Sequence, residues 1–197
     1  MLSWLRILAV AACALWLTAC AAPQTTADPH DLIKSGWNEF TLSEFDRAVA
    51  RFEEALAKTP ETDDLHLQAL YGLASTWNLR RPGEDVEKAR ELYEQIIRLA
   101  PKSETAIWSR LALARLKHLV PVGKEPDYNE VRKAYQQIID QYPGHLAAKE
   151  AFIYKMSTLI ASLKPAETKQ AIRELEEFVK DPNTPFRGPA YSLIAVG

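Results

Sequence analysis

The chain has 197 residues, of which 47% are hydrophobic and 25% charged, enough apolar content for a substantial core in one ordinary domain. Its formal net charge of −2 and pI near 6.1 give no sign of the clustered basic surface that nucleic-acid binding requires. Both cysteines, Cys13 and Cys20, fall in the first twenty residues, so the rest of the chain has no disulfide framework and no thiolate metal site.

The first twenty-eight residues are predicted to be a targeting segment. A short stretch, 1–6, carries one positive charge and is followed by an apolar run, 7–17, which is too short to span a bilayer as a helix. This length suits a secretory signal peptide. The run ends with Leu17-Thr18-Ala19-Cys20, which resembles the bacterial lipobox, in which the cysteine is lipidated and becomes the first residue. We therefore expect a lipoprotein signal peptide over 1–20 and a flexible tether over 21–28.

Two alternatives to this interpretation remain: a plain signal peptide with a chance cysteine, and an uncleaved anchor. If Cys20 is lipidated, more than one acyl chain on it makes anchoring stable. Ala21 follows the cysteine, and by resemblance to the enterobacterial sorting rule this favours the outer membrane. The expected location is therefore the bacterial envelope, lipid-anchored in the outer membrane and facing the periplasm.

A nine-residue segment, Tyr93–Pro101, occurs again almost unchanged forty-two residues later, at Tyr135–Pro143. Looser copies stand at 52–60 and 175–182. With the small or β-branched residue four places upstream, the copies have the spacing i, i+4, i+7, i+8, one stripe of an amphipathic helix. Their sets are Ala48/Phe52/Ala55/Leu56, Ala89/Tyr93/Ile96/Ile97, Val131/Tyr135/Ile138/Ile139 and Ala171/Leu175/Phe178/Val179. A proline that ends each helix and steps of 41, 42 and 40 residues indicate a helical repeat array.

The predicted repeat domain covers 29–197, with units at about 29–60, 65–101, 105–143 and 144–182 and an end helix at 185–196. Enlarged loops interrupt the second and third units around 80–83 and 121–126, where proline and glycine stop the helices. Ser43 is expected to cap the second helix. The fold class is all-α: an α-solenoid of about four helix pairs, whose C-terminal helix covers the otherwise exposed end.

The first unit matches the tetratricopeptide (TPR) pattern without a gap, through Gly36, Phe45, Ala48, Phe52, Ala55 and Pro60. The resemblance extends over 29–182, specific in three units and loose in the fourth. It implies that Gly36 and Ala48 let two antiparallel helices approach closely, and that Phe52 fills the gap to the next pair. By the same resemblance Trp108 is expected in the core. The family also binds protein or peptide partners along a concave surface formed by the first helices.

Catalytic motifs are missing from the sequence. It has no Gly-x-Ser-x-Gly motif, no phosphate-binding Gly-x-x-x-x-Gly-Lys loop and no His-Glu-x-x-His helix. Its acidic doublets would point about 100° apart on a helix, as solvated faces do. The four histidines are scattered. We therefore expect no enzyme activity, no cofactor, no metal and no small-molecule substrate.

Two partner-binding surfaces are predicted. The groove positions carried over from the family are Trp37, Phe40, Leu73, Trp77, Arg110, Leu113 and Lys117. Aromatic and arginine side chains are enriched at binding hot spots, although each apolar member could instead pack between neighbouring helices. The second surface is the edge formed by the enlarged loops, with Arg80, Arg81, Lys124 and Asp127.

The function expected from these patterns is a lipid-anchored periplasmic TPR scaffold that binds a protein or peptide partner in envelope assembly. Residues 140–151 look like a helix end and helix start of TPR lipoproteins such as the BamD-type component of β-barrel insertion. A pilotin-like or cell-wall-coordinating TPR lipoprotein is the alternative within the binding class. An enzyme or enzyme subunit is the alternative from another class.

Overall fold

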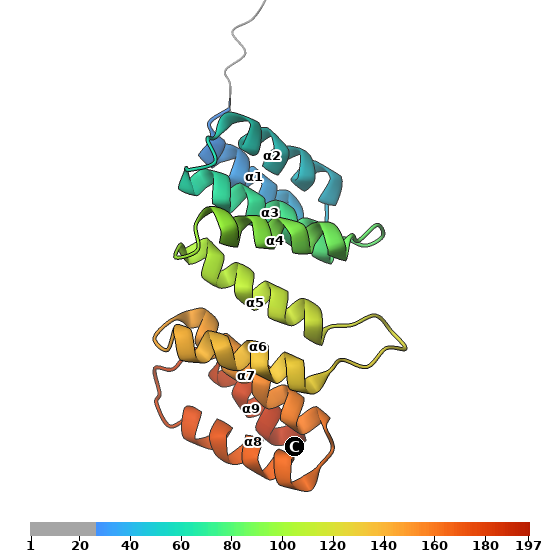
Figure 1. Cartoon of the computed structure of the whole chain (residues 1–197), viewed down its shortest axis with the longest axis vertical. Coiled ribbons are helices and arrows are strands. Elements are labelled where there is room, and N and C mark those ends of the chain that lie inside the picture. Colours follow the sequence, from blue (N-terminus) through green and yellow to red (C-terminus); the bar gives the residue numbers. More distant parts are fainter. Residues whose placement is uncertain (1–26) are drawn as a thin grey trace, which may run out of the picture.

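The structure, a computed structural model, describes residues 27–197 (Figure 1). The predicted signal peptide, the lipidation site Cys20 and the tether up to residue 26 lie outside the described residues. Within 27–197 the chain forms nine α-helices and no strand. The prediction of an all-α solenoid of helix pairs is therefore confirmed.

Eight helices form four antiparallel pairs, one in each predicted unit. Their bounds are α1 Pro29–Thr41 and α2 Phe45–Lys58, α3 Asp64–Leu79 and α4 Val86–Leu99, α5 Glu104–His118 and α6 Tyr128–Gln141, and α7 Leu146–Ala161 and α8 Pro165–Phe178. The last helix, α9, covers Arg187–Val196 and packs against both α7 and α8. No helix among residues 27–197 combines the length and apolar character needed to cross a membrane.

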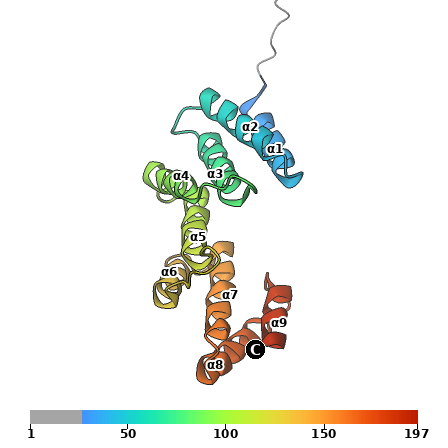
Figure 2. The same ribbon diagram turned by 90° about the vertical axis from the view of Figure 1, so that its right-hand side faces the viewer.

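The array has an inner and an outer face. The first helices of successive pairs contact one another, α1 with α3, α3 with α5 and α5 with α7, and α9 contacts α7 in the same way. In the described part of the chain, the second helices α2, α4, α6 and α8 make no such contacts with each other. Figure 2 shows α4 and α6 on one side of α5, and α9 on the other side of α7. The first helices therefore form the inner face, and the second helices form the outer face.

One large side chain from each second helix fills the space between the helices of successive pairs. These residues are Phe52, Tyr93, Tyr135 and Leu175, each at most 2% exposed. The residue one turn earlier is small in three of the pairs and valine in α6. A Cβ at Gly36 would lie 2.7 Å from Cε1 of Phe52, and one at Gly72 would lie closer still. These two glycines are required because the Phe52 ring occupies the space of their missing side chains.

The predicted capping role of Ser43 is wrong. Ser43 has φ 62° and donates its backbone N–H to the carbonyl of Phe40, so it ends α1 in a left-handed turn. The residue before α2 is Glu44, which makes no side-chain cap. The connection between α1 and α2 is so short that it needs a residue with positive φ, and Ser43 takes that conformation instead of a capping one.

Candidate functional site

Partly exposed aromatic side chains follow the inner face from pair to pair. We call Trp37 of α1, Tyr71 of α3, Trp108 of α5 and Tyr154 of α7 the aromatic row. The rings of Trp37 and Tyr71 are 6.4 Å apart between centroids. Together with Trp108 these two residues line a cavity of about 120 Å³, whose other walls are Gln68, Glu104 and Thr105. The row thus offers apolar ring surface bordered by hydrogen-bonding groups.

Trp108 is held in place by polar contacts at its edge. Its indole Nε1 donates to Glu104, one turn earlier, at 2.8 Å. The other carboxylate oxygen of Glu104 lies 2.8 Å from Nε2 of His145, whose ring is 5.6 Å from that of Trp108. The hydrogen bond with His145, then that with Trp108, holds the pKa of Glu104 below its usual value. Trp108 packs against the core cluster formed by α5, α6 and α7, as expected, but its ring is only partly buried and also borders this cavity.

Arg115 connects the middle of the row to its last member. Its guanidinium lies 5.1 Å from the centroid of the Tyr154 ring, a cation–π distance. Among the described residues its buried Nε has no hydrogen-bond partner. Burial raises the pKa of both Tyr71 and Tyr154. Their hydroxyls therefore remain protonated at neutral pH and are able to donate hydrogen bonds to a partner.

The seven predicted groove residues do not share one surface. Trp37 belongs to the aromatic row, and Phe40 packs edge-to-face on it with a centroid distance of 5.4 Å. Leu73 is a core residue, 5% exposed. Trp77 is half-buried, and Nζ of Lys88 lies 3.9 Å from the centroid of its ring. Of these four, the structure supports only Trp37 and its neighbour Phe40 as inner-face positions.

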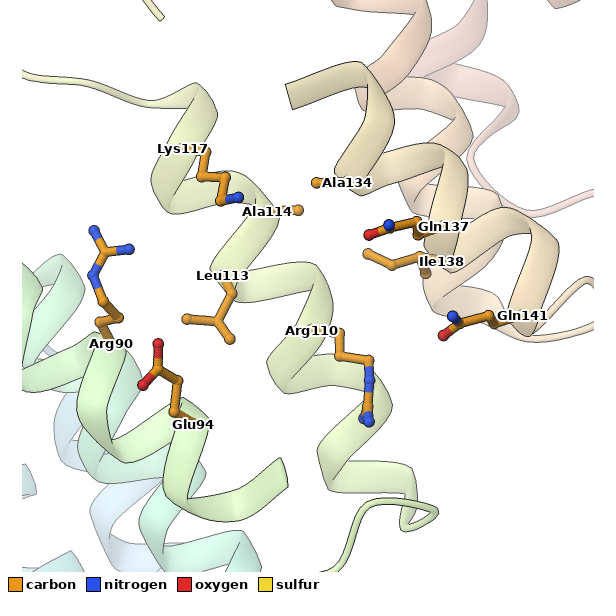
Figure 3. A pocket seen from close by; sticks show the side chains of 10 residues that line it. All are labelled: Arg90, Glu94, Arg110, Leu113, Ala114, Lys117, Ala134, Gln137, Ile138 and Gln141. Atoms are coloured by element: carbon orange, nitrogen blue, oxygen red, sulfur yellow. The ribbon is translucent and has the colours of Figure 1, made fainter. Parts of the chain in front are cut away.

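The other three predicted groove residues, Arg110, Leu113 and Lys117, line a cavity of about 410 Å³ on the outer side of α5 (Figure 3). We call it the outer cavity; α4 supplies Arg90 and Glu94, and α6 supplies Gln137, Ile138 and Gln141. Successive residues of a helix turn by about 100°, so Arg110 and Lys117 lie roughly opposite Trp108 and Arg115 on α5. These three positions therefore do not face the aromatic row, and their role in partner binding stays a prediction.

Most of the predicted loop-edge residues stabilise the loops themselves. Arg80 pairs with Asp46 of α2 at 2.7 Å and lies over the Trp77 ring. Arg81 donates to the carbonyl of Arg80 at 2.7 Å, and the carboxylate of Asp127 caps the first turn of α6. The Lys124 side chain is without an ion pair or hydrogen bond to any residue in 27–197. A role in partner binding stays a prediction for all four.

Metal chemistry finds no support in the described residues. No three or more His, Cys, Asp and Glu side chains in 27–197 gather so that they could hold a metal ion. Ionisable residues on the inner face instead contact neighbouring aromatic rings, as Glu104 and Arg115 do. Their arrangement is suited to holding a polypeptide.

Comparison with known proteins identifies one of the helix pairs. Residues 68–103 match the model of the tetratricopeptide repeat, a range that covers most of α3, all of α4 and the turn after it. The chain contains a tetratricopeptide repeat. No curated protein matches the chain. The repeat and the stacked helix pairs around it indicate a TPR-like solenoid that acts as a scaffold for protein–protein interaction.

Proposed function

We propose that the TPR-like array holds a segment of a protein partner against its inner face, with the aromatic row as the main contact surface. One observation carries this proposal: four successive first helices each contribute a partly exposed aromatic ring to the same face. Tryptophan and tyrosine combine large apolar area with a polar edge, which explains their enrichment at protein interfaces. In this proposal the array holds and positions the partner.

The side chains of the aromatic row indicate what kind of partner segment would fit there. Rings from α1, α3 and α5 surround a small cavity that accepts one apolar side chain, and the polar groups of Gln68 and Glu104 border it. An extended segment would place such a side chain there, with its backbone amides beside these polar groups. Farther along the row, the partly exposed side chain of Arg115 brings a guanidinium to the inner face, which can donate to a carbonyl or carboxylate of the partner.

We further propose that Cys20 carries lipid and anchors the array to the outer membrane, facing the periplasm. The apolar run 7–17 and the Leu-Thr-Ala-Cys sequence that follows support this proposal. The envelope process served is either assembly, as in BamD-type lipoproteins, or secretion and cell-wall synthesis, as in pilotin-like and cell-wall-coordinating ones. Recovery of β-barrel assembly subunits with the membrane-bound protein favours the first process, and recovery of secretin or synthase subunits favours the second.

The inner face is tested by a photo-crosslinking amino acid placed in the full chain at position 108. The matched control carries the same amino acid at Glu91, an exposed position on α4 of the outer face. We expect a discrete protein adduct in cells from position 108 and none from position 91. Equal adducts from both positions, or an adduct from position 91 alone, would contradict docking on the inner face.

The anchor is tested by Cys20→Ala. We expect loss of labelling with a fatty-acid analogue and release of the protein from the membrane fraction. Unchanged labelling and fractionation would show that no acyl chain is attached at Cys20. The crosslinking result at position 108 does not depend on this outcome, because docking and anchoring use different parts of the chain.

A further inference from the structure

The four connections within the helix pairs lie along one side of the array, at the right of Figure 1. We call this side the loop edge; it comprises 42–44, 80–85, 119–127 and 162–164 together with the adjoining last residues of the first helices. Large apolar side chains are exposed in three of the four connections, Leu42 74%, Leu119 62%, Val122 107% and Leu163 86%, and at the end of α3 before the remaining one, Leu79 46%. On the opposite edge only Leu99 and Leu146 are comparably exposed in the described chain, at 37% and 51%.

The loop-edge leucines contribute little to the stability of the array. A side chain as exposed as Val122 or Leu163 buries almost no apolar surface on folding. Leu163 also has φ 57°, a left-handed conformation that a leucine adopts only at a cost. Single exposed apolar residues are common on protein surfaces. The recurrence of an exposed leucine at or just after the end of all four first helices is what requires a reason.

The shape of the loop edge favours a lipid surface over a protein groove. Its leucines lie at or just after the ends of the first helices, one helix pair apart, and Val122 lies in the loop after α5. They form separate apolar tips and do not line one continuous apolar groove. A protein partner would need a matching pocket for each tip. A bilayer has a continuous apolar interior, so separate apolar side chains can insert into it without matching pockets.

The charge of the loop edge indicates how such contact would be driven. Its cations are Arg80, Arg81, Lys117, Lys124 and Lys164, and its carboxylates are Glu44, Glu84, Asp85, Glu125 and Asp127. These charges leave no positive excess to attract anionic lipids, unlike the polybasic segments that bind membranes electrostatically. Contact through this edge must therefore come from apolar insertion and be nearly independent of salt.

We infer that the loop edge rests on a bilayer surface, with Leu42, Leu79, Leu119, Val122 and Leu163 inserted at the boundary between headgroups and acyl chains. The chain before α1 is long enough for this arrangement. Helix α1, of 13 residues, puts Pro29 roughly 20 Å from the loop edge, and residues 20–28 span at most about 30 Å. The distance that the chain can span matters only if the proposed lipid anchor is present. The exposure of the apolar side chains does not depend on that anchor.

The test places an environment-sensitive fluorescent amino acid in the full chain at position 122, and in a matched control at position 146 on the opposite edge. Vesicles of phosphatidylcholine contain a lipid with a quencher in its acyl chain. We expect severalfold stronger quenching at position 122 than at position 146, unchanged at high salt. Equal quenching at both positions, or no association of the full chain with vesicles, would overturn the inference. A fluorescence change at position 122 that depends on protein concentration without vesicles would also overturn it, since it would reveal contact between copies.

The side chains themselves are tested by replacing Leu42, Val122 and Leu163 together with serine. The control variant replaces Leu99 and Leu146 on the opposite edge. Both sets are exposed, so helicity and the unfolding midpoint of each variant serve as a check of folding. In Cys20→Ala full chain we expect the triple change to lower partitioning into phosphatidylcholine vesicles by about tenfold or more, and the control to lower it little. Equal losses would contradict contact through the loop edge, while crosslinking at position 108 would still report on partner docking.

Discussion

Phe52 and Tyr135 are two of the filler residues, the large side chains that fill the space between successive helix pairs. They occupy the same repeat position in two regions of the array, and different interactions hold them. Both are 0% exposed. Phe52 fits because Gly36 and Gly72 leave room for its ring on either side. The Tyr135 hydroxyl lies 3.1 Å from Nδ1 of His118, and its ring stacks on Tyr154 at 5.7 Å. The packing of Phe52 therefore depends on the volume left by the two glycines, and that of Tyr135 depends on a partly buried hydrogen bond.

The largest effect is expected from Gly72→Val, which forces side-chain atoms into the space of the Phe52 ring. Overpacking of this kind costs about 3 kcal/mol of unfolding free energy, measured by urea denaturation. Gly144→Ala is the control, since a Cβ at Gly144 meets nothing within 4 Å, and it should change stability by less than about 0.5 kcal/mol. Similar values for the two variants would contradict the fit of Phe52 between the glycines.

Exchanging the two filler residues should sharpen the comparison. Phe52→Tyr adds a hydroxyl where Gly72 packs against the ring, so we expect a loss of about 2 kcal/mol. Tyr135→Phe removes the hydrogen bond to His118 and should cost about 1 kcal/mol. Urea denaturation of both variants shows which one loses more unfolding free energy. A larger loss for Tyr135→Phe than for Phe52→Tyr would contradict the comparison.

The space filled by Tyr135 should respond to mild acid through His118. Burial, and then the charge of Arg115, lowers the pKa of His118 below its ordinary value of 6.5. The unfolded chain therefore binds a proton on this residue more readily than the folded chain. Stability is retained above pH 6.5 and falls as the pH decreases from there toward the lower folded pKa.

We expect the melting temperature to fall between pH 7.5 and 5.5, and to fall less in His118→Gln. Tyr135→Phe gives a second test, because it removes the hydroxyl that faces His118 while leaving the histidine titratable. If His118→Gln shows the same pH dependence as the unaltered chain, the titration belongs to other groups and the contrast between the two filler residues is lost.

The smallest effect is expected on the outer face of α5. Lys117→Ala removes an exposed side chain that lines the outer cavity, so stability should change by less than about 0.5 kcal/mol. Crosslinking from position 108 should be unchanged. Loss of the adduct in this variant would show that the outer cavity takes part in docking.

The sequence was sufficient for the helix pairs and for their filler residues. Each second helix carries the same apolar spacing before a stop, and Phe52, Tyr93, Tyr135 and Leu175 are all buried as that spacing requires. Periodicity identifies the buried stripe of each helix. It does not show which face of the array each partly exposed residue lies on. For that reason Arg110 and Lys117 were expected on the inner face although they line the outer cavity, and the partial exposure of Trp108 was not foreseen.

Local loop chemistry was harder to predict than the repeats. Arg80 and Asp127 looked like free charges of an edge, but the first pairs with Asp46 from an earlier helix and the second caps α6. The sequence spacing of 34 residues between Asp46 and Arg80 gives no sign that they meet. Tyr71 and Tyr154 were missed because their role depends on stacking of successive first helices, which no single unit shows.

Crosslinking from all four positions of the aromatic row in separate full-length variants tests the central claim most directly. If an extended segment docks along the inner face, positions 37, 71, 108 and 154 should each form an adduct with the same partner, and the attachment sites should follow one another in order along its sequence. Attachment to unrelated partners, or to sites without such order, would contradict a single docking surface formed by the stacked first helices.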